Sequence, residues 1–111
     1  MLAHEAAAAN QAKESGCFTV IVGNPPYAGH SANNNVPTIV SAVHEYKRGY
    51  PDLQKPGQGK WLQNDYVKFI RFSELKVRAN AIGVLGFITD HSYLDNPTFK
   101  GMRNHLRQSF P

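Results

Sequence analysis

The sequence predicts an α/β fold built on parallel β-strands. Two short apolar runs, residues 18–23 and 82–89, are continuous in hydrophobicity and contain β-branched residues, a pattern typical of strands covered on both faces. Helix-forming segments at residues 2–14 and 64–79 precede these runs, and a third such segment follows at 97–108. Helices that alternate with buried strands favour a parallel sheet with crossover connections.

The first helix is predicted from composition. Residues 2–14 are rich in alanine, the best helix former, and contain no glycine or proline. Gly16 follows at the position that helix C-termini favour. Cys17 stands at the foot of the first strand, where we expect a small buried hydrophobe, and a single cysteine excludes an intrachain disulfide.

The middle of the chain, residues 28–63, is predicted to be largely irregular. Its first ten residues are polar and turn-forming, and a short helix is expected over residues 37–46 with Pro37 at its first position. The stretch Gly57-Gln58-Gly59-Lys60 is superficially like a phosphate loop. It lacks the earlier spaced glycine, the following Ser or Thr and a preceding strand, so a flexible turn is the better interpretation.

The helix at residues 64–79 is predicted to start at a cap formed by Asn64 or Asp65 and to close at Asn80. Apolar residues recur in it at near-helical spacing, which predicts one buried face. That face is expected to hold Leu62, Tyr66, Phe69, Ile70 and Val77, with Lys68, Arg71, Glu74 and Lys76 largely on other faces.

Two glycines in the second strand, residues 82–89, indicate close neighbours. Residues 90–96 are predicted to form a loop. The last helix, residues 97–108, is basic and carries Phe99, Met102 and Leu106 on one side.

Composition sets outer limits on function. The chain has 111 residues, enough for one small domain, and a net charge of +4, which suits a phosphate-rich partner and equally suits a solvated basic surface. Five scattered histidines and one cysteine give no metal-ligand spacing. We expect a cytoplasmic protein without a membrane segment, because no signal peptide and no run of about 20 apolar residues is present.

Asn24-Pro25-Pro26-Tyr27 follows the first strand directly. Taken singly, each residue has a structural interpretation: Asn24 starts a turn, the two prolines end a strand, and Tyr27 is a half-buried aromatic. Together, behind a strand, they resemble the catalytic motif of the amino-methyltransferases, above all the DNA N6-adenine methyltransferases. The resemblance implies that the Asn24 side chain and the Pro25 carbonyl accept hydrogen bonds from an amino group, that Pro26 holds this geometry, and that Tyr27 stacks on the base.

Three later segments extend this resemblance. Residues 64–72, 83–94 and 99–106 are similar to the helix, strand-loop and helix that follow the motif in Type ISP and Type IIG-like restriction–modification enzymes. The resemblance implies a partial Rossmann-like fold, namely the C-terminal part of the parallel sheet with flanking helices. It further implies S-adenosylmethionine as cofactor, and as partners DNA with an extruded adenine and the remainder of a larger polypeptide.

Asp90, His91 and Ser92 follow the second strand at its ligand-facing end. These residues either line a base pocket or cap the loop. The same two interpretations apply to Tyr93.

Two elements of the family are not found here. Its glycine-rich cofactor turn and the acidic residue that binds the cofactor precede the motif, whereas residues 1–17 contain no Gly-x-Gly. We therefore expect a fragment that is inactive alone, with an inactive remnant or partial reading frame, or a protein-glutamine methyltransferase, as alternatives. The predicted partial catalytic domain, residues 1–111, comprises a catalytic strand-loop (17–36), a variable segment (37–63), a helix (64–79), a strand and loop (82–96) and a helix (97–108).

Overall fold

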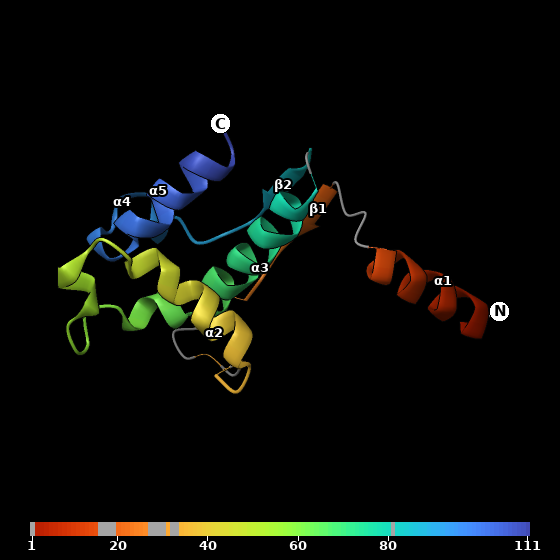
Figure 1. The fold of residues 1–111 in the computed structure, drawn as a ribbon, viewed down its shortest axis with the longest axis horizontal. Helices are drawn as coiled ribbons and strands as arrows, with labels where there is room; N and C mark the ends of the chain where they lie inside the picture. Colours follow the sequence, from red (N-terminus) through yellow and green to blue (C-terminus); the bar gives the residue numbers. More distant parts are fainter. Residues whose placement is uncertain (1, 16–19, 27–30, 32–33, 81) are drawn as a thin grey trace.

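The computed structural model describes residues 2–15, 20–26, 31, 34–80 and 82–111. Figure 1 shows a body of helices with a small sheet on one side, and one helix that projects from it. The elements are, in chain order, α1 (Leu2–Ser15), β1 (Val20–Gly23), α2 (Pro37–His44), the 3-10 helices η1 (Glu45–Lys47), η2 (Pro51–Gln54) and η3 (Lys60–Gln63), α3 (Asp65–Ala79), β2 (Val84–Phe87), α4 (Ser92–Asp95), the 3-10 helix η4 (Pro97–Phe99) and α5 (Lys100–Ser109).

The two strands pair in parallel, as the sequence predicted. Val20 lies opposite Val84 and Gly23 opposite Phe87. The pairing continues for one more hydrogen bond, in which the Ile88 amide donates to the Gly23 carbonyl at 3.0 Å. The described part of the chain is thus a mixed helix–strand structure with a two-stranded parallel sheet.

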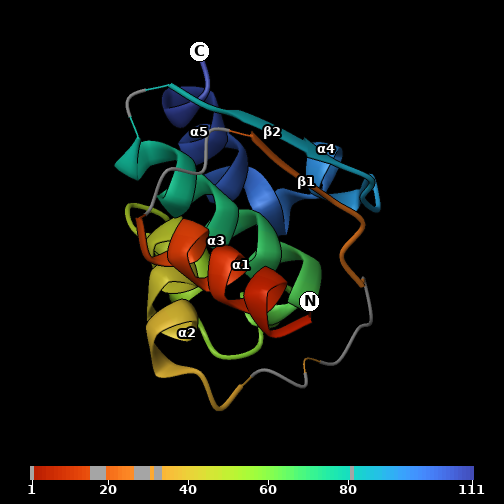
Figure 2. The same cartoon turned by 90° about the vertical axis from the view of Figure 1, so that its right-hand side faces the viewer.

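The sheet is covered on one face only, which corrects the prediction of strands buried on both faces. Side chains alternate between a half-buried set and an outward set in both strands. The outward residues Val20, Val22 and Val84 are 62%, 76% and 60% exposed. Helix α3 contacts both strands from the inner side (Figure 2). The apolar sequence of the strands suits a two-sided environment, but the described residues provide only one covering layer.

The hydrophobic core lies between helices. Tyr66 of α3 packs against Phe99 of η4 with ring centroids 6.1 Å apart, and Phe87 of β2 packs against the edge of this cluster. The order of helices predicted from the sequence is confirmed, and Phe99 and Met102 are buried as expected. The core comprises Val43, Tyr46, Leu62, Tyr66, Val67, Ile70, Phe99 and Met102.

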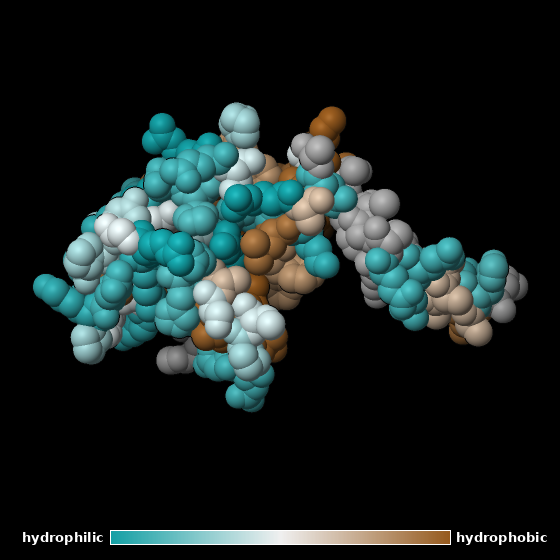
Figure 3. Space-filling view, viewed as in Figure 1, coloured by the Kyte–Doolittle hydropathy of each residue, from teal (hydrophilic) through white to brown (hydrophobic). Residues whose placement is uncertain are grey.

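Helix α3 differs from the prediction in which residues it buries. Lys68, Arg71 and Glu74 are 3%, 4% and 0% exposed, whereas Phe69 and Phe72 are half exposed. The charged side chains are buried because each has polar partners on neighbouring segments. Figure 3 shows hydrophobic surface over α3, the helix whose Phe69, Phe72 and Leu75 are 40% exposed or more.

Two further segments are more regular than predicted. Residues 49–63 contain η2 and η3, with Leu53 and Leu62 buried, and the predicted loop 90–96 contains the one-turn helix α4. Helix α1 formed as predicted and points away from the body, with its described side chains exposed (Figure 1). Across the residues described, no helix is both long and apolar enough to cross a membrane.

Candidate functional site

The carboxyl ends of β1 and β2 meet at one rim of the sheet, because the strands are parallel. Residues 24–26 leave this rim from β1, and residues 88–92 leave it from β2. The hydrogen bond between the Ile88 amide and the Gly23 carbonyl, 3.0 Å long, holds the two chain segments together there. In open parallel sheets, ligands bind at this rim.

The motif presents its amide outward. Asn24 and Pro26 are exposed, whereas Pro25 between them is buried. Proline fixes φ and has no amide hydrogen, so a buried Pro25 holds the backbone without adding a donor. Tyr27, the fourth predicted site residue, lies outside the described residues.

Asp90 and Ser92 form a turn at the end of β2. The Asp90 carboxylate accepts a hydrogen bond from the Ser92 amide at 2.6 Å, and this bond lowers the pKa of Asp90. That geometry matches the loop-capping interpretation of Asp90. His91, the residue between them, is exposed.

Tyr66 was not predicted as a site residue. It is buried, and its hydroxyl lies 3.2 Å from the Ser92 hydroxyl, which connects the start of α3 to the loop after β2. Burial raises the pKa of Tyr66. The sequence signal was available, since an aromatic with a hydroxyl stands two residues after the helix cap, but helical periodicity alone assigned it to the core.

The start of α3 carries a second polar cluster that the sequence reasoning missed. The Asn64 side chain caps the helix by accepting a hydrogen bond from the Tyr66 amide at 3.3 Å, as predicted. One turn on, the buried Lys68 ammonium donates to the Ser31 hydroxyl at 2.6 Å and to the Asn34 side-chain oxygen at 2.9 Å. The Ser31 hydroxyl in turn donates to the Asp65 carboxylate. Ser31 and Asn34, which follow the motif in sequence, are therefore bound to α3.

A large open groove runs along β2 and α5. Its volume is about 1190 Å³, and its lining includes Thr89 and Tyr93 but no residue of 24–26. Three arginines contribute to it, as do Phe110 and Pro111. We place the candidate site at the rim and not in this groove, because the amide-bearing motif is at the rim.

Two described stretches bear on how a cofactor could be held. A proline pair, and not a glycine turn, follows β1. The other glycine-rich stretch packs against its own chain, since a Cβ on Gly59 would lie 2.5 Å from Lys47 Cε and 2.8 Å from the Leu53 carbonyl oxygen. It is a turn and not an open cradle, as the sequence indicated. Within the described ranges, no three His, Cys, Asp or Glu side chains are placed to hold a metal ion.

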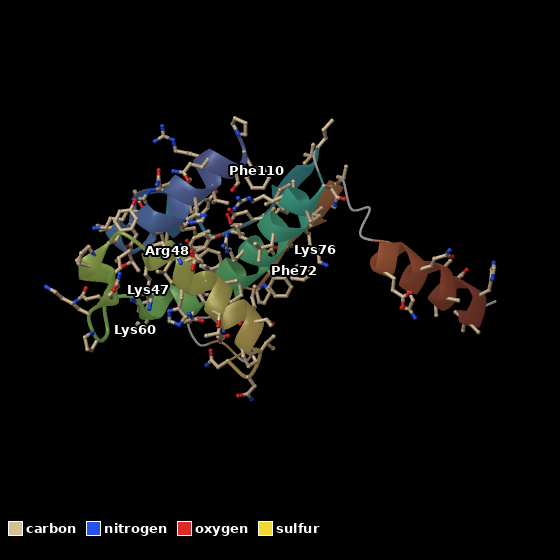
Figure 4. All side chains as sticks on the ribbon, viewed as in Figure 1. Lys47, Arg48, Lys60, Phe72, Lys76 and Phe110 are labelled. Atoms are coloured by element: carbon tan, nitrogen blue, oxygen red, sulfur yellow. The ribbon has the colours of Figure 1, made fainter. Side chains whose placement is uncertain are left out.

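Three cationic side chains lie at the end of the molecule away from the sheet, with the acidic residues Glu45 and Asp52 nearby in sequence. Lys47, Arg48 and Lys60 lie there, while Phe72 and Lys76 lie together on α3 (Figure 4). Arg48 is paired with Glu45 at 3.0 Å, and the Lys60 ammonium lies 5.2 Å from the Trp61 ring centroid. This corner is compatible with a polyanionic partner.

Comparison with protein-family models matches residues 2–110 with the family described as Eco57I restriction-modification methylase. Neither the curated proteins nor the solved structures give a match to the chain.

Proposed function

The chain belongs to the Eco57I restriction-modification methylase family, and we propose that it carries the amino-group-binding part of a DNA N6-adenine methyltransferase. Membership suggests a methyltransferase of a restriction–modification system that acts on DNA. Beyond membership, we propose two things: that the target is the adenine 6-amino group, and that individual residues have the roles given below.

The observation that carries this proposal is the placement of Asn24 and Pro25. They follow β1 at the rim where parallel strands receive ligands, with the amide exposed and the proline buried. A side-chain amide oxygen next to a backbone carbonyl that proline constrains offers two neighbouring acceptors.

Such a pair suits an aromatic amino group. The lone pair of an aromatic amino nitrogen is delocalised into the ring, so this nitrogen must become more tetrahedral as it attacks a methyl group. The Asn24 side-chain oxygen accepts one N–H and the Pro25 carbonyl accepts the other, and both stabilise the positive charge that develops on nitrogen. Tyr27 stacks on the extruded base, an interaction typically worth about 1–3 kcal/mol.

The loop after β2 forms the other side of the proposed base site. The hydrogen bond from the Ser92 amide to Asp90 supports a role for these two residues in shaping the loop. His91, which is exposed between them, is the member of the trio available to a bound base.

S-adenosylmethionine supplies the methyl group in this family's chemistry. Because a proline pair follows β1 and residues 1–17 contain no Gly-x-Gly, we limit the proposed role of this chain to the amino-group side. We further propose that the two strands are part of a Rossmann-like sheet, and that the chain works with the remainder of a larger restriction–modification polypeptide in the cytoplasm.

The test is the substitution Asn24→Ala in the polypeptide that carries these residues, with methyl transfer measured on adenine-containing duplex DNA. Loss of one preorganised partner of the developing charge is expected to lower kcat by about 100-fold or more. Asn104→Ala, at an exposed asparagine on α5, is the matched control and should leave kcat unchanged.

Two results would contradict the proposal. Undiminished turnover by the Asn24→Ala protein would remove the assigned role of the amide. Methyl incorporation into a glutamine-containing protein and not into DNA would assign the chemistry to a carboxamide, which poses the same problem of a delocalised lone pair.

A further inference from the structure

Two charged residues at the start of α3 are buried. Lys68 is 3% exposed and Asp65 is 6% exposed. Lysine and aspartate are almost never fully buried unless they are paired, because removing a charge from water is costly. Burial accordingly lowers the pKa of Lys68, and the nearby Asp65 carboxylate opposes this effect.

The stability of α3 does not explain Lys68. A cation in the first turns of a helix meets the positive end of the helix dipole, which is unfavourable. The helix start is already capped by the Asn64 side chain. Lys76, further along the same helix, is only half-buried and lies 5.6 Å from the Phe72 ring centroid (Figure 4).

The contacts of Lys68 lead to the segment that follows the motif. Its ammonium donates to Ser31 at 2.6 Å and to Asn34 at 2.9 Å. The Ser31 hydroxyl donates onward to the Asp65 carboxylate, and the Asn34 amide donates to the Ser31 carbonyl oxygen at 3.2 Å. These four side chains form one network, which we call the Lys68 anchor.

Described residues on both sides of the motif have fixed partners. Upstream, β1 is fixed by its pairing with β2 as far as the Gly23 carbonyl. Downstream, Ser31 is fixed by the anchor, seven residues after Asn24. Asn24 and Pro25 form their acceptor pair between these two fixed points.

We propose that Lys68 and Asp65 are positioning residues: they fix Ser31 and Asn34, the first described residues downstream of Asn24-Pro25-Pro26 apart from the intervening gap, and thereby limit where the motif lies when it meets the base. The inference rests on the proposed function and adds the residues that set its geometry. Catalytic groups must be held within about 0.5 Å of their working position, and a displacement of about 1 Å costs on the order of 100-fold in rate.

The experiment compares Lys68→Met, which keeps the stem and removes the ammonium, with Lys76→Met as a matched control on the same helix. Hydrogen exchange of the peptides that contain Ser31 and Asn34 is measured on the 111-residue chain. Lys68→Met is expected to raise exchange there by at least 10-fold, and Lys76→Met should not. Ser31→Ala, on the loop side of the anchor, should repeat the effect and replaces Lys68→Met if that variant does not fold.

The same variants are then assayed for methyl transfer in the polypeptide that carries these residues. A positioning role predicts a kcat 10- to 100-fold lower per folded site with the KM for DNA within about 3-fold of wild type, and partial rescue by Lys68→Arg. A purely structural role would lower the amount of folded protein and leave kcat per site unchanged.

Unchanged exchange in both Lys68→Met and Ser31→Ala, or unchanged kcat per folded site, would overturn the inference. If Asn24→Ala proves fully active while exchange still rises in Lys68→Met, the anchor exists and the proposed function has failed instead.

Discussion

At the scale of single residues, the Glu74 carboxylate joins three elements of the body. Tyr46 of η1 and Arg71 of α3 donate to one of its oxygens at 2.8 and 2.9 Å. From α5, Ser109 donates to the other oxygen at 2.6 Å, and His105 Nδ1 lies 3.5 Å from it. Burial by itself would raise the pKa of Glu74, but these hydrogen bonds and the charge of Arg71 outweigh it, so the pKa lies below its usual value.

We predict that Glu74→Gln destabilises the chain by about 3 kcal/mol at pH 7, because it leaves the Arg71 guanidinium buried without its counter-charge. A depressed folded-state pKa contributes stability that is present above the unfolded-state pKa, about 4.3 for glutamate, and is lost as the pH falls through the folded-state value. The gap between wild type and variant should therefore be widest at neutral pH and shrink in acid. Urea unfolding between pH 7 and pH 3 measures it.

The control for this prediction is Glu45→Gln, because Glu45 pairs with Arg48 at the surface. Exposed ion pairs contribute about 0–1 kcal/mol, so this variant should stay close to wild type. A Glu74→Gln chain as stable as the control at pH 7, or a gap that widens in acid, would contradict the assignment.

At the scale of elements, α5 approaches η1 through a glycine. A Cβ on Gly101 would lie 1.7 Å from the Tyr46 carbonyl oxygen, a distance that no side chain can accept. Gly101 is buried, and the backbone of α5 rests directly on the end of η1. The contact is possible only with a hydrogen atom at this position.

We predict that Gly101→Ala lowers the free energy of unfolding by about 3 kcal/mol, since overpacking at a rigid backbone contact forces the helix to shift. Helix propensity alone predicts the opposite effect of Gly101→Ala, a rise of about 1 kcal/mol in the free energy of unfolding. Gly86→Ala is the control, because a Cβ there meets only Val22 Cγ1 at 3.6 Å, an ordinary contact. Thermal melting of the two variants decides between packing and propensity, and a more stable Gly101→Ala chain would refute the close approach.

Composition and cap residues predicted the helices well, whereas hydrophobic periodicity predicted their buried faces less well. Alanine content, proline and asparagine placed the ends of α1, α2 and α3 to within a few residues. Periodicity failed for α3, where Lys68 and Glu74 are buried and Phe69 is exposed. Periodicity treats charge as a solvent signal, whereas these charges are satisfied by partners 28 to 37 positions away in sequence.

The site shows the same division. The position of Asn24 behind a strand is local information, and the structure places it at the end of β1 as predicted. The Lys68 anchor and the Tyr66–Ser92 pair are products of tertiary contact, so no spacing rule marks them. Local patterns predict where a backbone turns, but they do not predict which distant side chain holds it.

At the scale of the whole molecule, the described residues leave one face of the sheet uncovered. Val20, Val22, Val84 and Ile88 are each at least 60% exposed. Parallel sheets are almost always covered on both faces, and two strands alone form a marginal sheet. A contiguous apolar face of this kind favours association and low stability in the isolated chain.

We predict that Val22→Thr combined with Val84→Thr changes the melting temperature by less than about 4 °C, because exposed substitutions stay within about 0.5 kcal/mol. The same pair should reduce self-association in sedimentation experiments and the binding of a hydrophobic dye.

The matched variant is Ile21→Thr on the adjacent position of β1, whose side chain faces inward and is half-buried. It should cost about 1 kcal/mol or more, because it removes inward-facing methylene groups at roughly 0.8 kcal/mol each. If the outward pair destabilises the chain as much as Ile21→Thr does, both faces of the sheet are covered in solution. The one-sided packing would then be wrong.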